Sequence, residues 1–159
     1  MAGSSRSESA RGGGWVVLQF AVMGLTLVAG LAPPHWPRGA HAALSVLGGA
    51  LAVCGGAIAV LASRRLGRSF TPFPRPLEAA ELIERGPYSI VRHPVYSAGL
   101  VFFLGYSLFA SIPALAATGV LAVVWALKAR VEERFLRERY PGYEGYARRV
   151  RYRLLPPVY

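Results

Sequence analysis

The feature that most constrains this chain is an uncharged stretch that begins after His93 and ends before Lys128. It is predominantly apolar and long enough to cross a bilayer and return as two helices. Pro113, which follows Ser111 and Ile112, suits the first turn of the second helix after a very tight reversal. The sequence therefore predicts a helical hairpin whose polar ends lie on the same side of a membrane.

Four apolar segments stand out along the chain, at residues 15–32, 42–62, 95–112 and 113–127. At ~1.5 Å rise per residue, the first three span or nearly span a ~30 Å hydrocarbon core as helices. The fourth is short, and we expect Lys128 and Ala129 to extend it by snorkelling. Because 53% of the residues are hydrophobic, we expect an all-α polytopic membrane helix bundle with four transmembrane helices rather than a soluble domain.

The chain divides into three parts by composition. Residues 1–12 are rich in glycine and serine and are predicted to be disordered, and residues 13–62 hold the first two transmembrane helices. Residues 63–159 hold a proline-rich interfacial loop, the helical hairpin and a cytoplasmic C-terminal helical extension. A cleaved signal peptide is the alternative for the first apolar segment, disfavoured by its length and by the Pro33-Pro34-His35 sequence that ends it.

Charge distribution predicts the orientation in the membrane. The chain has 18 basic residues against 8 acidic ones, and its arginines gather in residues 63–93 and in the segment that starts at Lys128. The positive-inside rule then places both the N and the C terminus in the cytoplasm. Nucleic-acid binding is disfavoured because the basic residues border apolar spans and no nucleic-acid motif is visible, so we expect anionic lipid headgroups as the partner.

Glycine pairs and a lone cysteine occur within the second apolar segment. Gly48-Gly49 and Gly55-Gly56 lie in a uniformly apolar helix, which favours close helix packing over a nucleotide-binding loop. Cys54 is the single cysteine, so the chain has no internal disulfide and no cysteine-based metal site. Its position favours a buried packing role, and we expect no metal centre.

Two polar clusters meet the uncharged stretch, Arg92-His93-Pro94 before it and Glu132-Glu133 after it. On a helix, Lys128 and Glu132 share one face, and Glu133 and Arg137 form a second pair on a neighbouring face. Each cluster alone is compatible with solvated ion pairs or an interfacial histidine. Their placement on the same side of the membrane favours a functional site.

The spaced motifs resemble one family. Gly86-Pro87-Tyr88, Arg92-His93-Pro94-Val95-Tyr96 with Gly99, Glu132-Glu133 with Leu136, and Tyr143, Tyr146 and Arg149-Val150 together resemble the isoprenylcysteine carboxyl methyltransferase family and its phospholipid-methylating relatives. The resemblance covers about residues 67–156 and implies a membrane enzyme that uses S-adenosylmethionine without a soluble Rossmann domain. It makes residues 63–159 the methyltransferase core. The cofactor-binding residues that it implies are Leu82, Ile83, Tyr88, His93, Pro94, Val95, Tyr96 and Glu132.

The acceptor of the methyl group stays open. The family's substrate-contacting arginine falls on Lys128, and Arg149 or Arg153 could fold back to compensate for the change. An isoprenylcysteine-type carboxylate would need Lys128 and Arg149 to orient it, whereas an aminolipid such as phosphatidylethanolamine would need Glu133 or His93 as a base. A small thiol or acid is a further acceptor.

Three other points also stay open. A non-enzymatic membrane scaffold is the alternative from another functional class, and it predicts no cofactor affinity. A second copy could complete a bundle of four short spans, which leaves a homodimer open. The tyrosine-rich C-terminal segment either folds back over the spans as a lid or lies among the lipid headgroups.

Overall fold

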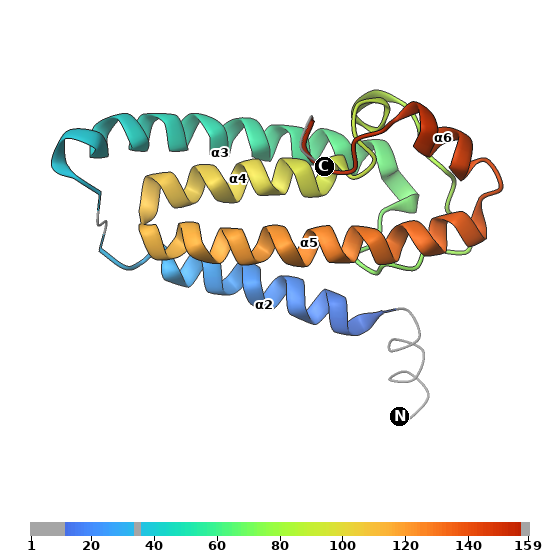
Figure 1. The fold of residues 1–159 in the computed structure, drawn as a ribbon, viewed down its shortest axis with the longest axis horizontal. Coiled ribbons are helices and arrows are strands. Elements are labelled where there is room, and N and C mark those ends of the chain that lie inside the picture. Colours follow the sequence, from blue (N-terminus) through green and yellow to red (C-terminus); the bar gives the residue numbers. More distant parts are fainter. Residues whose placement is uncertain (1–11, 34–35, 157–159) are drawn as a thin grey trace.

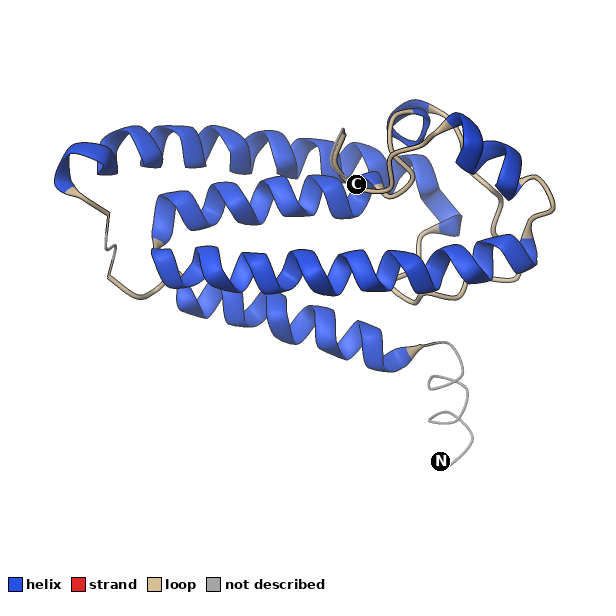
Figure 2. Ribbon diagram, in the orientation of Figure 1, coloured by secondary structure: helices blue, strands red, loops and turns tan. Residues whose placement is uncertain are grey.

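The computed structural model describes residues 12–33 and 36–156, and this part of the chain is helical, with no strand. Figure 2 shows helices joined by loops throughout. The prediction of an all-helical fold is confirmed, whereas the predicted disorder of residues 1–12 lies, apart from Gly12, outside the described residues. The helices are α2 (Gly13–Ala29), α3 (Arg38–Leu66), α4 (Pro94–Ala110), α5 (Ile112–Arg139) and α6 (Tyr143–Arg149), with the 3₁₀ turns η1 (Gly67–Ser69) and η2 (Gly86–Ser89).

The four long helices lie side by side in one layer, in the order α3, α4, α5, α2 (Figure 1). The consecutive helices α2 and α3 therefore lie at opposite edges of the layer, and the hairpin of α4 and α5 lies between them. The loops before α4, the end of α5 and α6 gather at one end of the layer. This end also carries most of the charged residues of the chain.

Two helices are long and apolar enough to cross a membrane, Gly39–Ser69 and Ile112–Arg139. The apolar helices α2 and α4 have 17 residues each, which corresponds to about 25 Å at ~1.5 Å per residue. Large apolar side chains along α3 are exposed, among them Val46, Val53 and Leu61. A lipid environment would cover such side chains, whose exposure to water is unfavourable.

The reversal between α4 and α5 is as tight as the sequence predicts, because Ser111 alone separates the two helices. Its hydroxyl accepts a hydrogen bond from the N–H of Ala114 and so caps α5. The same hydroxyl donates to the carbonyl of Ala29 at 2.8 Å, which ties the turn to the end of α2. Helix α5 then continues without a break to Arg139, as predicted for the extension beyond residue 127.

Small residues bring α3 and α4 into backbone contact, which confirms the predicted close packing for one glycine of each pair, Gly48 and Gly55. A Cβ at Gly48 would lie 2.5 Å from the carbonyl oxygen of Gly105, and one at Gly55 would lie 2.7 Å from that of Ala98. These distances are too short for any side chain. The expectation for Cys54 is wrong, because its side chain is exposed on α3.

The core lies between α2, α4 and α5. Its buried members from α4 and α5 include Phe103, Leu121 and Trp125, and Val22 contributes from α2. Lys128 lies at the end of this core and is also fully buried, so the expectation that it snorkels to the surface is wrong. Its ammonium finds hydrogen-bond partners inside the protein instead.

Replacing Gly55 by alanine is expected to destabilise the protein by about 1–3 kcal/mol, because the new methyl group would overlap with backbone atoms of α4 that cannot move aside. Gly49→Ala is the matched control on the same helix, since a Cβ there meets nothing within 4 Å. It should be neutral or stabilising, because alanine favours helix more than glycine does. Unfolding of both variants in detergent would measure the difference, and equal stabilities would contradict this account of the packing.

Candidate functional site

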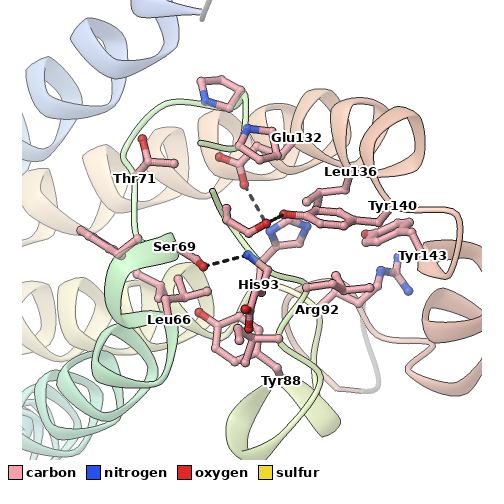
Figure 3. A pocket seen from close by; sticks show the side chains of 18 of the residues that line it. Leu66, Ser69, Thr71, Tyr88, Arg92, His93, Glu132, Leu136, Tyr140 and Tyr143 are labelled. Atoms are coloured by element: carbon pink, nitrogen blue, oxygen red, sulfur yellow. Dashed lines mark hydrogen bonds and ion pairs between the residues drawn. The ribbon is translucent and has the colours of Figure 1, made fainter. Parts of the chain in front are cut away.

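A pocket opens at the end of the layer where the loops gather, with an empty volume of about 840 Å³ including its mouth. Figure 3 shows its side chains converging from α3, the loop after it, the start of α4 and the end of α5. The lining residues are Leu66, Ser69, Phe70, Thr71, Phe73, Pro74, Pro76, Ala80, Glu81, Leu82, Ile83, Tyr88, Arg92, His93, Val95, Tyr96, Glu132, Leu136, Tyr140, Tyr143 and Tyr146.

The polar centre of this pocket is Glu132, which two side chains from the start of α4 contact. The hydroxyl of Tyr96 donates a hydrogen bond to its Oε1, and Nδ1 of His93 lies 3.4 Å from its Oε2. The rings of His93 and Tyr96 are stacked, with centroids 5.7 Å apart, and Tyr96 stacks in turn on Trp125 in the core. This stack fixes the rings, so Glu132 meets preoriented partners.

Local sequence explains why His93 lies at the pocket. Gly86 adopts a left-handed conformation with φ 66°, which a side chain would disfavour, and Pro87 then starts η2. Pro94 occupies the first turn of α4 and disfavours a helical conformation of the residue before it, so His93 lies outside the helix with φ −125° and ψ 63°. The backbone N–H groups of Arg92 and His93 donate to the carbonyls of residues 152 and 153, each at 3.0 Å.

These bonds place the C-terminal segment (residues 150–156) beside Arg92 and His93. It folds back along the start of α4, where the hydroxyl of Ser97 also donates to the carbonyl of Leu154 at 2.5 Å. The guanidinium of Arg92 donates to the carbonyls of Val150 and Arg151. The segment therefore supports the pocket from behind His93.

The Glu133 cluster consists of Glu133, Arg92, His93, Arg137 and Arg153. The Glu133 carboxylate is fully buried and accepts hydrogen bonds from Nε of Arg92 at 2.8 Å and Nε of Arg153 at 2.9 Å. Arg137 and His93 approach it at 3.4 Å. One carboxylate thus joins α5, the start of α4 and the C-terminal segment.

Lys128 is separate from this cluster. Its ammonium donates to the side-chain oxygen of Gln19 and to the carbonyl of Pro72, both at 2.6 Å, and lies 3.8 Å from Glu132. Arg149 is exposed on α6 and pairs with Glu84. The described residues that line the pocket do not include Lys128, Arg149 or Glu133.

The residues that the resemblance implies for cofactor binding thus come together. With the exception of Pro94, which begins α4, they all line the pocket: Leu82, Ile83, Tyr88, His93, Val95, Tyr96 and Glu132. The residues assigned to catalysis, Lys128, Glu133 and Arg149, are held in ion pairs or hydrogen bonds around it. Their assignment stays a prediction.

Sequence reasoning missed two groups of residues. Apolar and aromatic side chains of the loop after α3, such as Phe70 and Phe73, form one wall of the pocket, and Tyr140 closes another. The prolines of the loop indicated an interfacial position but gave no contact partner. Gln19 was also missed, although a lone amide within an apolar span is a signal of a buried polar contact.

Burial and neighbouring carboxylates set the protonation of the site. Burial lowers the pKa of His93, but hydrogen bonds and attraction from Glu132 and Glu133 outweigh it, so the pKa is raised above its ordinary value. Burial raises the pKa of Tyr88 and of Tyr146, which therefore stay neutral. The phenol of Tyr146 donates to the carbonyl of Tyr88 at 2.8 Å.

Fold and site together define a helical protein with a ligand pocket at the charged end of an apolar helix layer. A family model described as phospholipid methyltransferase matches residues 43–142, more than half of the chain. The chain belongs to the phospholipid methyltransferase family. With two helices long and apolar enough to cross a membrane, this family membership identifies an integral membrane protein.

Two curated relatives match part of the chain. The cobalt-zinc-cadmium resistance protein CzcN of Cupriavidus metallidurans is 44% identical over 73 residues, which are 43% of this chain and 33% of CzcN. The nickel-cobalt-cadmium resistance protein NccN of Alcaligenes xylosoxydans xylosoxydans is 35% identical over 77 residues, 46% of this chain and 35% of NccN. The matches span about a third of the length of these relatives. Among the described residues, no three His, Cys, Asp or Glu residues are grouped so that they could hold a metal ion.

Replacing Glu133 by glutamine should destabilise the protein by about 1–3 kcal/mol, because it removes the buried charge to which the partly buried guanidinium groups of Arg92 and Arg153 donate hydrogen bonds. Glu144→Gln is the matched control, since Glu144 pairs with Arg137 at 2.7 Å on the exposed surface, where a pair contributes about 0–1 kcal/mol. Denaturant unfolding in detergent would compare the two variants. A loss at Glu133 as small as that at Glu144 would contradict the role of the buried cluster.

The raised pKa of His93 predicts a pH-dependent stability. The folded state binds the proton more tightly than the unfolded state, so this contribution is complete below the ordinary pKa of about 6.5 and is lost as pH rises through the folded-state pKa. The melting temperature of the wild type should exceed that of His93→Gln most at low pH, and the difference should shrink as pH rises. A difference that grows with pH would reverse the assigned direction.

Proposed function

We propose that the protein is an S-adenosylmethionine-dependent methyltransferase that acts on a lipophilic acceptor at the membrane surface. The observation that carries the proposal is the pocket in which His93, Tyr96 and Glu132 meet beside the apolar helix layer. Family membership supports methyl transfer, and the position of the pocket supports an acceptor that reaches it from the lipid.

The residues of the pocket fit this cofactor chemically. Glu132 offers carboxylate oxygens to the amino or ribose hydroxyl groups of the cofactor and suits its sulfonium charge. Tyr88 is buried at the side of the pocket and can pack against adenine. Leu82 and Ile83, from the loop before η2, add apolar lining.

Bound S-adenosylmethionine supplies a methyl group activated by its positive sulfur. The acceptor contributes the electron pair for the new bond to carbon, and the carbon–sulfur bond breaks with its electrons left on sulfur. The pocket then has to align the two molecules and keep water out, for which the rigid ring stack of His93, Tyr96 and Trp125 is suited. No covalent enzyme intermediate is required.

The membrane arrangement that we propose has four crossings, made by α2, α3, α4 and α5. In the layer, the end of α2, the start of α3 and the turn between α4 and α5 lie at the end opposite the pocket (Figure 1). Arginines near the pocket end, such as Arg64, Arg65 and Arg68, favour anionic headgroups and a cytoplasmic position. Both termini would then be cytoplasmic.

The acceptor suggested by the resemblance is an isoprenylcysteine-type carboxylate. An aminolipid such as phosphatidylethanolamine is the second candidate, and one observation favours it. The pocket presents the Glu132 carboxylate and His93, and its lining residue Arg92 already pairs with Glu133, whereas Lys128 is buried outside the pocket and Arg149 pairs with Glu84. An ammonium acceptor has to lose a proton before it attacks, and Glu132, or His93 in its deprotonated form, lies where a base would be needed.

The test is transfer of labelled methyl from S-adenosylmethionine by the purified protein in lipid nanodiscs. Farnesylcysteine analogues, phosphatidylethanolamine and small thiols are offered separately, and cofactor affinity is measured by calorimetry. Glu132→Ala should weaken cofactor binding by about tenfold to a hundredfold, which corresponds to the ~1.5–3 kcal/mol of a hydrogen bond to a charged group. His93→Ala should reduce transfer, and Glu138→Ala, an exposed change on the same helix, should leave both unchanged.

The products separate the acceptors. A base-labile methyl ester on the farnesylcysteine analogue would establish carboxyl methylation, and an N-methylated lipid would establish the aminolipid reaction. A wild-type protein that neither binds the cofactor nor transfers methyl to any acceptor would contradict the proposal and support a scaffold role.

A further inference from the structure

The environment of Lys128 differs from that of a substrate-binding cation. Its side chain is fully buried, and its Nζ makes two hydrogen bonds of 2.6 Å, to Oε1 of Gln19 and to the carbonyl of Pro72. The same Nζ lies 3.8 Å from Oε1 of Glu132 and 5.3 Å from the centroid of the Tyr96 ring. An ammonium group has three N–H donors, two of which make these hydrogen bonds, and the 3.8 Å contact with Glu132 is an ion pair rather than a third hydrogen bond.

Gln19 is the second unusual group. It is a buried amide on α2, 6% exposed, in a predominantly apolar helix. Its side-chain oxygen accepts from Lys128 and, at 3.4 Å, from the indole N–H of Trp125. Burial of such an amide in an apolar layer is costly unless it is hydrogen-bonded, and Lys128 supplies the shorter of the two bonds to the Gln19 oxygen.

The third partner connects this pair to the pocket. Pro72 belongs to the loop after α3, and its neighbours Thr71 and Phe73 line the pocket. Figure 3 shows Thr71 on this loop and Glu132 on α5 at the same pocket. The ammonium of Lys128 therefore joins three separate segments, α2, α5 and the loop, at the wall of the pocket.

We propose that Lys128 and Gln19 are positioning residues that fasten the loop at Pro72 and orient Glu132, and that Lys128 does not contact the methyl acceptor. This inference rests on the proposed function, because it assigns how the pocket is held in shape for its cofactor. The inference also bears on how the protein selects its methyl acceptor. An anionic acceptor group finds no free ammonium at Lys128, so discrimination between acceptors does not depend on this charge.

The test uses full-length protein in nanodiscs with the variants Lys128→Met and Gln19→Leu. Gln19→Glu is the conservative variant, because it keeps an oxygen acceptor for Lys128. Thr118→Val is the matched control, since it removes a buried hydroxyl of α5 that bonds to Ser107 at 2.8 Å and does not line the pocket.

Hydrogen exchange of the backbone N–H groups of Phe70 and Phe73, which are hydrogen-bonded in this proline-rich loop, is measured first, without cofactor. Exchange should rise at least tenfold in Lys128→Met and Gln19→Leu, return to near the wild-type rate in Gln19→Glu and stay unchanged in Thr118→Val. Wild-type exchange in Lys128→Met and Gln19→Leu would overturn the inference whether or not the protein is a methyltransferase.

Cofactor affinity and acceptor kinetics of the same variants are measured next, to test how Lys128 and Gln19 affect the pocket. Both disrupting variants should weaken S-adenosylmethionine binding about tenfold or more, and the double variant should lose little beyond either single one because both act on one contact. The acceptor KM should stay within about twofold of wild type. A raised acceptor KM with unchanged cofactor affinity in Lys128→Met would instead make Lys128 an acceptor-binding group and overturn the inference. A wild type that binds no cofactor would overturn the proposed function, while the exchange result still decides the fastening role.

Discussion

The pocket depends most on the balance of charge at two adjacent carboxylates near the end of α5, which neighbouring cationic side chains compensate. Glu132 and Glu133 point to different neighbours, because successive residues of a helix lie on different faces. Glu133 is buried among the guanidinium groups of Arg92 and Arg153. Without these partners, a carboxylate in such a position would be strongly unfavourable, so the start of α4 and the C-terminal segment have to meet at this point.

The two carboxylates therefore divide structural and binding roles. Glu133 accepts from several donors and is fully buried, which leaves little capacity for a ligand. Glu132 is partly exposed in the pocket and is oriented by Tyr96, His93 and Lys128. A pocket carboxylate held in this way by rigid aromatic and cationic neighbours is suited to bind a cationic ligand without rearrangement.

The helix layer supplies the rigid frame for these contacts. Backbone contact of α3 with α4 at Gly48, Gly55 and Gly105 fixes the position at which the loop after α3 begins. The tight turn at Ser111 fixes α5 beside α4, so His93 and Glu132, far apart in the sequence, face each other. A layer of four helices also leaves its apolar faces exposed, which agrees with a lipid surrounding.

The sequence by itself determined the helices and the reversal at Ser111, and the family resemblance of its motifs identified seven of the residues that line the pocket. Hydrophobic length, Pro94, Pro113 and the spacing of the His93 and Glu132 motifs are local properties, so they can be read without a structure. The tertiary structure alone decided that Lys128 is buried against Gln19, that Glu133 is enclosed by arginines and that the loop near Pro72 forms a wall. These outcomes depend on which segments meet across the layer, and the hydrogen-bond needs of a buried charge are fixed only when its neighbours are in place.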